Sequence, residues 1–299
     1  MCESEMVSLR DNKKIFVSCS DKIKNAKTLL YLHGGPGGGC NDFLYIAHLL
    51  SNEFNVISFD QRGVLRSEAI TENELLTVDM LVEDIEDLRK IKGINELYLL
   101  GHSYGGFLAL LYALKYPNNV KAIIYENSAW NMIDAIKTIH KNTIPFIRNG
   151  GDNALADKIE SVLNSCNDLK ELADLQMETP EKYRIEAYYN KPWTDEQKSF
   201  YKPFEITDEQ EKSSEYHRQK IIADDINYKD NMSKLKDIKV PSLLVRGEYD
   251  PVMSKEYQQY FVENTPNGRL KIISDSGHSI HCDAPHEFCA VIKEFIRAS

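Results

Sequence analysis

The feature that most constrains the fold of this 299-residue chain is a G-x-S-x-G motif at residues 101–105, centred on Ser103. An apolar run at residues 97–100 leads into the motif, and a helix-like apolar run at residues 107–114 follows it. This order predicts a strand, a sharp turn and a helix, with the serine hydroxyl projecting clear of the sheet. The flanking glycines would allow the turn to be tight and the strand and helix to pack closely. Ser103 is therefore a candidate nucleophile, provided that a base and oxyanion donors lie nearby.

A second glycine-rich segment follows another apolar run. Residues 30–32 are Leu-Tyr-Leu, and residues 34–39 contain five glycines and one proline. Such a loop leaves its backbone N–H groups unobstructed, which suits an oxyanion hole of the His-Gly-Gly type. A phosphate-binding loop is the alternative, but the Gly-Lys-Ser/Thr sequence that it requires does not follow.

Two C-terminal segments supply a candidate acid and a candidate base. Asp250 follows the apolar run at residues 243–245, and His278 follows the run at residues 270–273. The chain order serine, aspartate, histidine is that of the catalytic triad in α/β-hydrolases. An imidazole can both take and return a proton near neutral pH, and a carboxylate beside it fixes its tautomer. We therefore expect a triad of Ser103, Asp250 and His278.

Other residues near these motifs are weaker candidates. His102 adjoins the serine, and neighbouring residues on a sharp turn point apart, so it should not be the base. Asp275 lies too near His278 in sequence to reach the far nitrogen of its ring comfortably. Cys40 has no base paired with it. We expect His281 to line the C-terminal loop and His33 to brace the glycine loop.

Together these segments resemble the proline iminopeptidase (prolyl aminopeptidase) group of α/β-hydrolases. The matching motifs are HGGPG at residues 33–37, DQRG at 60–63, GHSYGG at 101–106, GEYD at 247–250 and GH at 277–278. HGGPG and DQRG are the specific elements. The resemblance covers roughly residues 28–127 and 236–299 and leaves the middle of the chain unmatched.

The resemblance implies an acyl-enzyme mechanism with no metal or other cofactor. Ser103 would be the acylated nucleophile, His278 its general base and Asp250 the orienting acid. The backbone N–H groups of Gly35 and Tyr104 would hold the oxyanion. The substrate would be a small molecule or a short peptide.

The sequence departs from this family at positions that bear on specificity. After DQRG the family usually has a small residue, a second glycine and a serine, whereas residues 64–67 here are Val-Leu-Arg-Ser. The family tends to bind the free amine of its substrate with two glutamates, and the matching positions here are Pro251 and Gln219. A small shift in the alignment would bring Glu211 or Glu215 to the second position. The catalytic machinery is therefore expected, while aminopeptidase specificity stays open.

Three functions follow from these observations. The chain cleaves a small amide, such as the bond after an N-terminal residue, or it hydrolyses a carboxylic ester. The third, from a different class, is a pseudoenzyme that uses the same pocket to bind a ligand.

The composition narrows the class of partner. The net charge of −10 disfavours nucleic acid and anionic membrane surfaces as partners. No apolar stretch approaches the length of a membrane span, and residues 1–5 show no signal-peptide pattern. The six cysteines lack zinc-site spacing and are interpreted as free thiols, which predicts a cytoplasmic location.

Strand and helix patterns alternate along most of the chain. The alternation predicts an α/β fold with a mostly parallel central sheet flanked by helices. A hairpin is expected within residues 5–18, and Thr77 should cap a helix at residues 78–91. We also expect Asp60 and Arg62 to pair beneath the glycine loop. Asp84 should belong to a solvated helix face or brace a helix against a loop.

The pattern changes after about residue 128. Residues 129–235 lose the strand signal and are helical, charged and rich in aromatics, before strand character returns. We interpret residues 1–128 and 236–299 as the hydrolase core. Residues 129–235 are interpreted as a helical cap inserted in it, with some aromatics lining the pocket.

Overall fold

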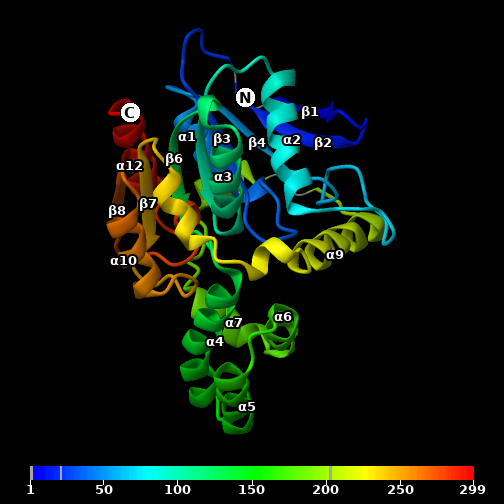
Figure 1. Ribbon diagram of the computed structural model, residues 1–299, viewed down its shortest axis with the longest axis vertical. Coiled ribbons are helices and arrows are strands. Elements are labelled where there is room, and N and C mark those ends of the chain that lie inside the picture. The colour runs from blue at the N-terminus through cyan, green and yellow to red at the C-terminus, as the bar shows by residue number, and fades with distance from the viewer. Residues whose placement is uncertain (1–2, 21, 202–203) are drawn as a thin grey trace.

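The computed structural model describes residues 3–20, 22–201 and 204–299 (Figure 1). The strands in these ranges are β1 Glu3–Ser8, β2 Lys14–Cys19, β3 Thr28–Leu32, β4 Asn55–Phe59, β5 Leu97–His102, β6 Val120–Glu126, β7 Ser242–Gly247 and β8 Gly268–Ile273. They form one sheet in the order β1-β2-β4-β3-β5-β6-β7-β8. β2 pairs antiparallel with β1 and β4, and the other neighbours are parallel. The predicted α/β class is confirmed.

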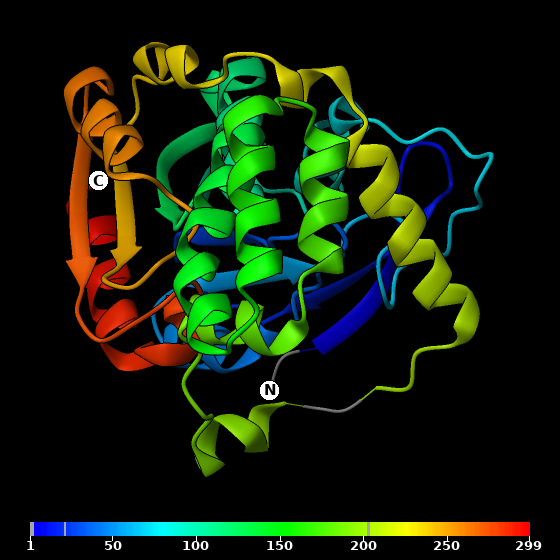
Figure 2. The same cartoon turned by 90° about the horizontal axis from the view of Figure 1, so that it is seen from below.

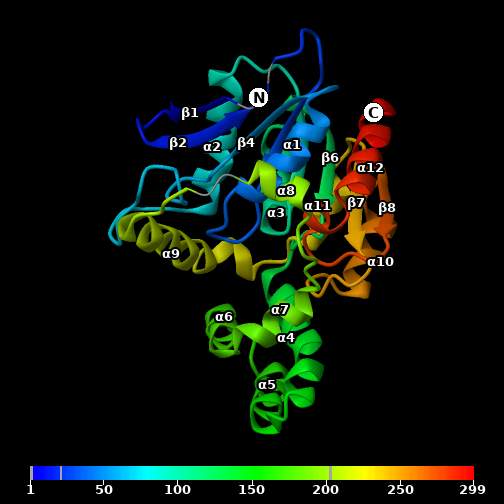
Figure 3. The same cartoon turned by 180° about the vertical axis from the view of Figure 1, so that it is seen from behind.

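Helices cover both faces of the sheet, so its central strands are buried on both sides. The helices outside the long β6–β7 connection are α1 Leu44–Leu50, α2 Val78–Ile91, α3 Tyr104–Lys115, α10 Lys255–Asn264, α11 Ile280–Asp283 and α12 Pro285–Arg297. Along β3, Leu30 and Leu32 pack with α2 and α3, whereas Leu29 and Tyr31 pack with α1 and α12. Figure 1 shows the first face and Figure 3 the second. The alternation follows from the two-residue period of a strand.

Two local predictions at element ends are confirmed. The Thr77 side chain accepts a hydrogen bond from the Met80 N–H at 3.2 Å, which caps α2. β1 and β2 form an antiparallel hairpin, and Asn12 in its turn has a φ of 66°. Asparagine tolerates this left-handed conformation better than most residues, so the turn falls where the sequence breaks.

The connection between β6 and β7 contains helices and loops but no strand in the part that the structure describes. Its α-helices are α4 Met132–Asn149, α5 Asn153–Ser165, α6 Leu169–Glu178, α7 Glu181–Tyr188, α8 Asp195–Phe200 and α9 Asp208–Ile222. Figures 1 and 2 show α4–α7 gathered at one end of the sheet. Four of these helices share a small buried cluster of their own, which includes Ile147, Ile159, Leu175 and Tyr183. The inserted helices therefore have a partly separate core.

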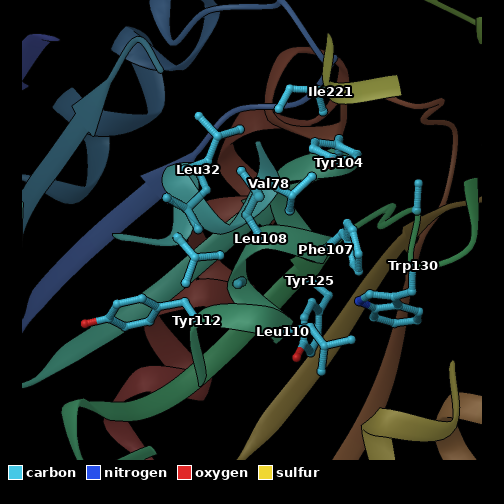
Figure 4. Close-up of a cluster of buried hydrophobic side chains, with 14 of the residues drawn as sticks. Leu32, Val78, Tyr104, Phe107, Leu108, Leu110, Tyr112, Tyr125, Trp130 and Ile221 are labelled. Atoms are coloured by element: carbon cyan, nitrogen blue, oxygen red, sulfur yellow. The ribbon is translucent and has the colours of Figure 1, made fainter. Parts of the chain in front are cut away.

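The last long inserted helix, α9, packs directly on the hydrolase core. Ile221 belongs to the same buried cluster as Tyr104 and Leu108 of α3 (Figure 4). The Ser213 hydroxyl donates to the Gly63 carbonyl at 2.6 Å and accepts from the Ile70 N–H at 2.8 Å. These contacts hold α9 against the loop that follows β4.

The expected pairing of Asp60 with Arg62 is wrong. Arg62 instead forms a bidentate pair with the buried Asp84 of α2, at 2.9 and 2.7 Å, and also contacts Asp11. Asp60 pairs with Arg66, at 2.6 and 2.8 Å. A planar guanidinium group can donate to both oxygens of a carboxylate. Arg62 faces Asp84 of α2 in this way, and Arg66 faces Asp60. Asp84 is therefore a brace between a helix and a loop.

Two further sequence observations bear on the described residues. No helix in the described ranges has both the length and the apolar character needed to cross a membrane. Cys40, Cys166, Cys282 and Cys289 are free thiols, and Cys2 lies outside the described residues. The cytoplasmic location stays a prediction.

Candidate active site

Ser103 occupies a strained turn between β5 and α3. Its φ of 52° and ψ of −119° are unusual for a residue with a side chain, and it is only 8% exposed. Three backbone hydrogen bonds hold the turn. The Ser103 N–H donates to the Glu126 carbonyl at 2.8 Å, and its carbonyl accepts from Gly106 and Ala129 at 3.0 and 3.1 Å. The predicted sharp turn is thus fixed by its neighbours.

Glycine at position 105 is required by close packing. A Cβ atom there would overlap the carbonyl of Leu32 in the adjacent strand β3. The turn therefore brings Ser103 close to the glycine loop that follows β3, because a Cβ at Gly34 would lie 3.0 Å from the Ser103 Cβ. These close contacts explain why the glycine loop has glycine at position 34 and the serine turn has glycine at position 105.

Two backbone N–H groups in the segments around Ser103 have no acceptor among the described residues. Within the described residues, no group accepts a hydrogen bond from the N–H of Gly35 or of Tyr104. Tyr104 is the first residue of α3, where N–H groups lack partners inside the helix. His33 braces the loop as predicted, because its Nδ1 lies 2.8 Å from the Gly34 carbonyl and its Nε2 accepts from the Gln61 N–H.

His278 and Asp250 are brought together although they are 28 residues apart. The His278 Nδ1 lies 2.7 Å from the Asp250 Oδ1, and the two residues are 6% and 3% exposed. The backbone N–H groups of Val252 and Met253 donate to the same carboxylate, at 3.3 and 3.1 Å. A carboxylate that only accepts hydrogen bonds places the proton of the imidazole on Nδ1, which leaves Nε2 as an acceptor.

The Ser103 hydroxyl is not hydrogen-bonded to His278 in this structure, counting described residues only. The two lie in the same region, because the ring of the adjacent His102 is centred 4.8 Å from the His278 ring. Tyr188 also contacts the His278 ring edge-to-face at 5.2 Å, and it lines a cavity together with Ser103. Loose catalytic hydrogen bonds are common without substrate.

The cavity beside Ser103 has a volume of about 210 Å³. Its sheet side consists of residues from loops near the carboxyl ends of the strands, and its other side comes from α4, α6, α7 and α9. The lining residues are Gly35, Pro36, Ser103, Ala129, Met132, Ala135, Ile136, Ile139, Ala173, Gln176, Met177, Arg184, Tyr188, Arg218, Ile222 and Val252. The lining is mainly apolar, and the described residues in it include two arginines but no carboxylate.

The positions matched to the amine-binding glutamates contribute no acid to this cavity. Pro251 accepts a hydrogen bond from Asn142 through its carbonyl, and Gln219 is exposed and donates to Glu215. Glu211 and Glu215 line a different depression of about 490 Å³, which shares Pro36 and Arg218 with the first. Neither glutamate lines the cavity that contains the serine.

Comparisons with known proteins agree with this geometry. The family model for the alpha/beta hydrolase fold matches residues 27–147 and 173–285. The chain belongs to the α/β-hydrolase fold family.

Relatives within the family match nearly the whole chain. A proline iminopeptidase of Heyndrickxia coagulans is 26% identical, over 93% of this chain and 93% of the relative. One from Saccharolobus solfataricus is 30% identical, over 90% of this chain and 84% of the relative. A crystal structure of the proline iminopeptidase of Mycobacterium smegmatis has a TM-score of 0.76 at 22% identity, covering 99% and 98% of the two chains. The predicted resemblance to this group is confirmed at the level of distant homology.

A buried charge network lies behind the candidate site of this α/β-hydrolase. The His281 Nδ1 is 2.8 Å from the Glu126 Oε1, and its Nε2 is 3.2 Å from the Asp42 Oδ2. Burial alone would lower the pKa of His281, but the neighbouring acidic groups reverse this and raise it well above its usual value. Burial opposes the charged form of Glu126, yet the facing His281 lowers its pKa. The pair is therefore an imidazolium and a carboxylate.

The other histidine in this region, His102, is neutral. Burial lowers the pKa of His102 to about 4. Its Nε2 lies 3.2 Å from the His278 carbonyl, so it contacts the backbone of the candidate base rather than its ring nitrogens. This agrees with the prediction that His102 does not act as the base.

Among the described residues, two groups of side chains have the composition of a metal site. Their members are Asp42, His281 and Cys282, and His102, Glu126 and His281, with ligand atoms within 4.8 Å of one another. Both groups share His281, whose two ring nitrogens already face carboxylates. The atoms of His281 that would bind an ion therefore already take part in close contacts with Glu126 and Asp42.

Several residues of the site belong to no recognisable sequence motif. Of the aromatics noted in residues 129–235, Tyr188 is the one that lines the cavity. Arg184 and Arg218 were not predicted, because a charged residue on a helix usually faces solvent. Glu126 did leave a signal, since a glutamate directly after the apolar run 122–125 is unusual in a buried strand.

Proposed function

We propose that this chain is a serine hydrolase that transfers the acyl group of a small amide or ester to water. Ser103 is the nucleophile, His278 the general base and Asp250 the acid that orients it. The observation that carries the proposal is the buried hydrogen bond between His278 and Asp250 at 2.7 Å, beside a cavity lined by Ser103.

The chemistry follows from these placements. His278 Nε2 takes the proton of the Ser103 hydroxyl as the oxygen attacks the substrate carbonyl. The N–H groups of Gly35 and Tyr104 stabilise the oxyanion that forms, because they are oriented before the reaction begins. The same imidazole returns the proton to the leaving group. It then activates the water that releases the acid from the acyl-enzyme.

The substrate class is the finer part of the proposal. The full-length relatives carry the name proline iminopeptidase, which suggests cleavage after an N-terminal residue. The cavity favours a different substrate, because none of the described residues that line it has a carboxylate to pair with a free amine. We therefore propose an ester, or an amide without a free N-terminal amine, as the preferred substrate.

Labelling with a fluorophosphonate probe tests the nucleophile. We expect the unmodified protein to be labelled and Ser103→Ala to be unlabelled. Turnover of a short-chain 4-nitrophenyl ester should fall by roughly 10⁴–10⁶-fold in the same variant. A native protein that resists the probe and turns over no substrate would favour a ligand-binding pseudoenzyme instead.

Two substrates assayed side by side separate the proposed substrate classes. Prolyl-2-naphthylamide carries a free amine, whereas a 4-nitrophenyl butanoate carries none. We expect a higher kcat/KM for the ester. A strong preference for the prolyl amide would show that this protein recognises the amine without a carboxylate in the cavity.

A further inference from the structure

The charge of the cavity is positive where an amine-binding site would be negative. Among the described residues that line it, the side chains with a formal charge are Arg184 and Arg218. The remaining lining side chains are apolar or neutral. Arginine pairs with carboxylates through a planar, bidentate arrangement, so each of these residues is a possible anchor for an anion.

Arg218 is already neutralised by its own helix. Its Nε and Nη2 donate to the two carboxylate oxygens of Glu215, at 2.8 and 2.6 Å. Both partners lie on α9, three residues apart. A guanidinium that is paired in this way has little charge left to attract a ligand.

Arg184 on α7 differs, because no carboxylate of a described residue lies within ion-pair distance of it. Its Nε donates to the Thr179 carbonyl at 3.1 Å, and its Nη1 lies 4.0 Å from the Met177 sulfur. A thioether is a weak acceptor, so most of the five N–H donors of this guanidinium lack a strong protein partner. Met177 itself lines the cavity, which places the charged group at the cavity wall.

The position of Arg184 relative to the candidate triad is set by α7. Tyr188 lies one turn further along this helix, roughly 6 Å away along the axis, and its ring contacts that of His278. The Tyr188 hydroxyl accepts a hydrogen bond from Gln176 at 3.5 Å. Arg184 therefore lies about one helical turn from the residue that contacts the candidate base.

We infer that the preferred substrates of this enzyme carry a carboxylate, and that Arg184 binds it. This inference rests on the proposed serine hydrolase activity and specifies its substrate class. The carboxylate would lie several carbon atoms from the reacting carbonyl, because Arg184 is one helical turn away from the tyrosine that contacts His278. It belongs either to the acyl group, as in a half-ester of a dicarboxylic acid, or to the leaving group.

Matched pairs of esters distinguish these two sources. The first pair is mono-4-nitrophenyl adipate and its methyl ester, which differ in the charge at the end of the acyl chain. The second pair is 4-carboxyphenyl butanoate and its methyl ester, which differ in the charge on the leaving group. We expect kcat/KM for the anionic member of one pair to exceed that of its neutral partner at least tenfold.

Substitution of Arg184 tests whether it causes this preference. Arg184→Gln should lower the ratio of anionic to neutral kcat/KM at least tenfold, and Arg184→Lys should retain part of it. Lys182→Gln removes a charge from the exposed side of the same helix, so it should leave the ratio within twofold. No preference in either pair, or a preference that survives Arg184→Gln, would overturn the inference.

Binding without turnover keeps the test independent of the proposed mechanism. The probe is monomethyl adipate if the first pair shows the preference, or 4-carboxyphenyl butanoate if the second pair shows it. It is titrated calorimetrically against Ser103→Ala and against Ser103→Ala/Arg184→Gln. We expect the second variant to bind at least tenfold more weakly. Hydrolysis of the neutral esters, and its loss in Ser103→Ala, tests the hydrolase activity alone. Equal binding by the two variants would reject the role of Arg184 even if that activity were present.

Discussion

On the sheet side of the cavity, Gly35 and Ser103 lie in loops that directly follow strands, and the serine turn is fixed by three backbone hydrogen bonds. On the helical side, the wall consists largely of alanine, isoleucine and methionine side chains from inserted helices, such as Ile136 and Met177. The first side depends on backbone conformations that few residues can adopt. The second depends on apolar volume, which many residue types can supply. Chemistry and specificity thus have different structural requirements in this molecule.

The largest effect is expected on the sheet side, from Asp250→Asn. Both carboxylate oxygens accept backbone N–H groups, from Val252 and Met253, so an amide nitrogen at either position would face a donor. The amide would also favour the wrong tautomer of His278. We expect kcat to fall roughly 10⁴-fold, measured with a 4-nitrophenyl ester.

Asp275→Asn is the matched control for that substitution. Asp275 lies three residues before His278, but it is exposed and pairs with Lys191 and Tyr189. Its loss should change kcat less than twofold. Similar losses in the two variants would mean that Asp250 is not specifically coupled to the imidazole.

A smaller effect, on stability, is expected from His281→Ala. The change leaves the buried Glu126 without its imidazolium partner, which should lower the free energy of unfolding by about 3–5 kcal/mol. The Glu126 pKa is lowered from 4.5, so its contribution is present above pH 4.5 and is lost as the pH falls through the folded-state pKa. The His281 pKa is raised from 6.5, so its contribution is present below pH 6.5 and is lost as the pH rises through the folded-state pKa. The destabilisation should therefore be greatest between about pH 4.5 and 6.5, as urea titrations at several pH values would measure.

Two variants separate the ion pair from simple loss of a side chain. His286→Ala removes an exposed histidine from the same segment and should change stability by less than about 0.5 kcal/mol. Glu126→Gln combined with His281→Ala removes both charges, so it should be less destabilised than the sum of the single changes. Strict additivity would show that the two groups do not interact.

The contrast between the sheet side and the helical side of the cavity also explains which features could be predicted from the sequence. The strands, the Thr77 cap and the serine turn were predictable, because each depends on local pattern or on a glycine that packing requires. The contact of Asp250 with His278 was also anticipated, since parallel strands bring their carboxyl ends to one edge of the sheet. Their roles in catalysis stay a proposal.

The errors and omissions involve pairings that sequence spacing does not determine. Arg62 pairs with Asp84, 22 residues away, and Asp60 pairs with Arg66. No sequence pattern distinguished Arg184. It stands out because it lines the cavity with no carboxylate of a described residue beside it, and this depends on how the helices pack. Side-chain partners that belong to no recognised motif require coordinates, whereas the Asp250–His278 contact could be predicted because both residues lie in family motifs.

The smallest effects compare the two regions directly, through Ile159→Val in α5 and Ile123→Val in β6. Both side chains are fully buried, and each change should cost about 0.5–1.5 kcal/mol. Ile159 belongs to the small cluster shared by inserted helices, whereas Ile123 belongs to the core beneath the sheet. We expect hydrogen exchange to speed up only in α4–α7 for the first variant, but across the whole sheet for the second. If Ile159→Val also accelerated exchange in the central strands, the inserted helices and the sheet would unfold as one unit. In that case, substitutions in the helical wall would also affect the stability of the sheet that holds the candidate triad.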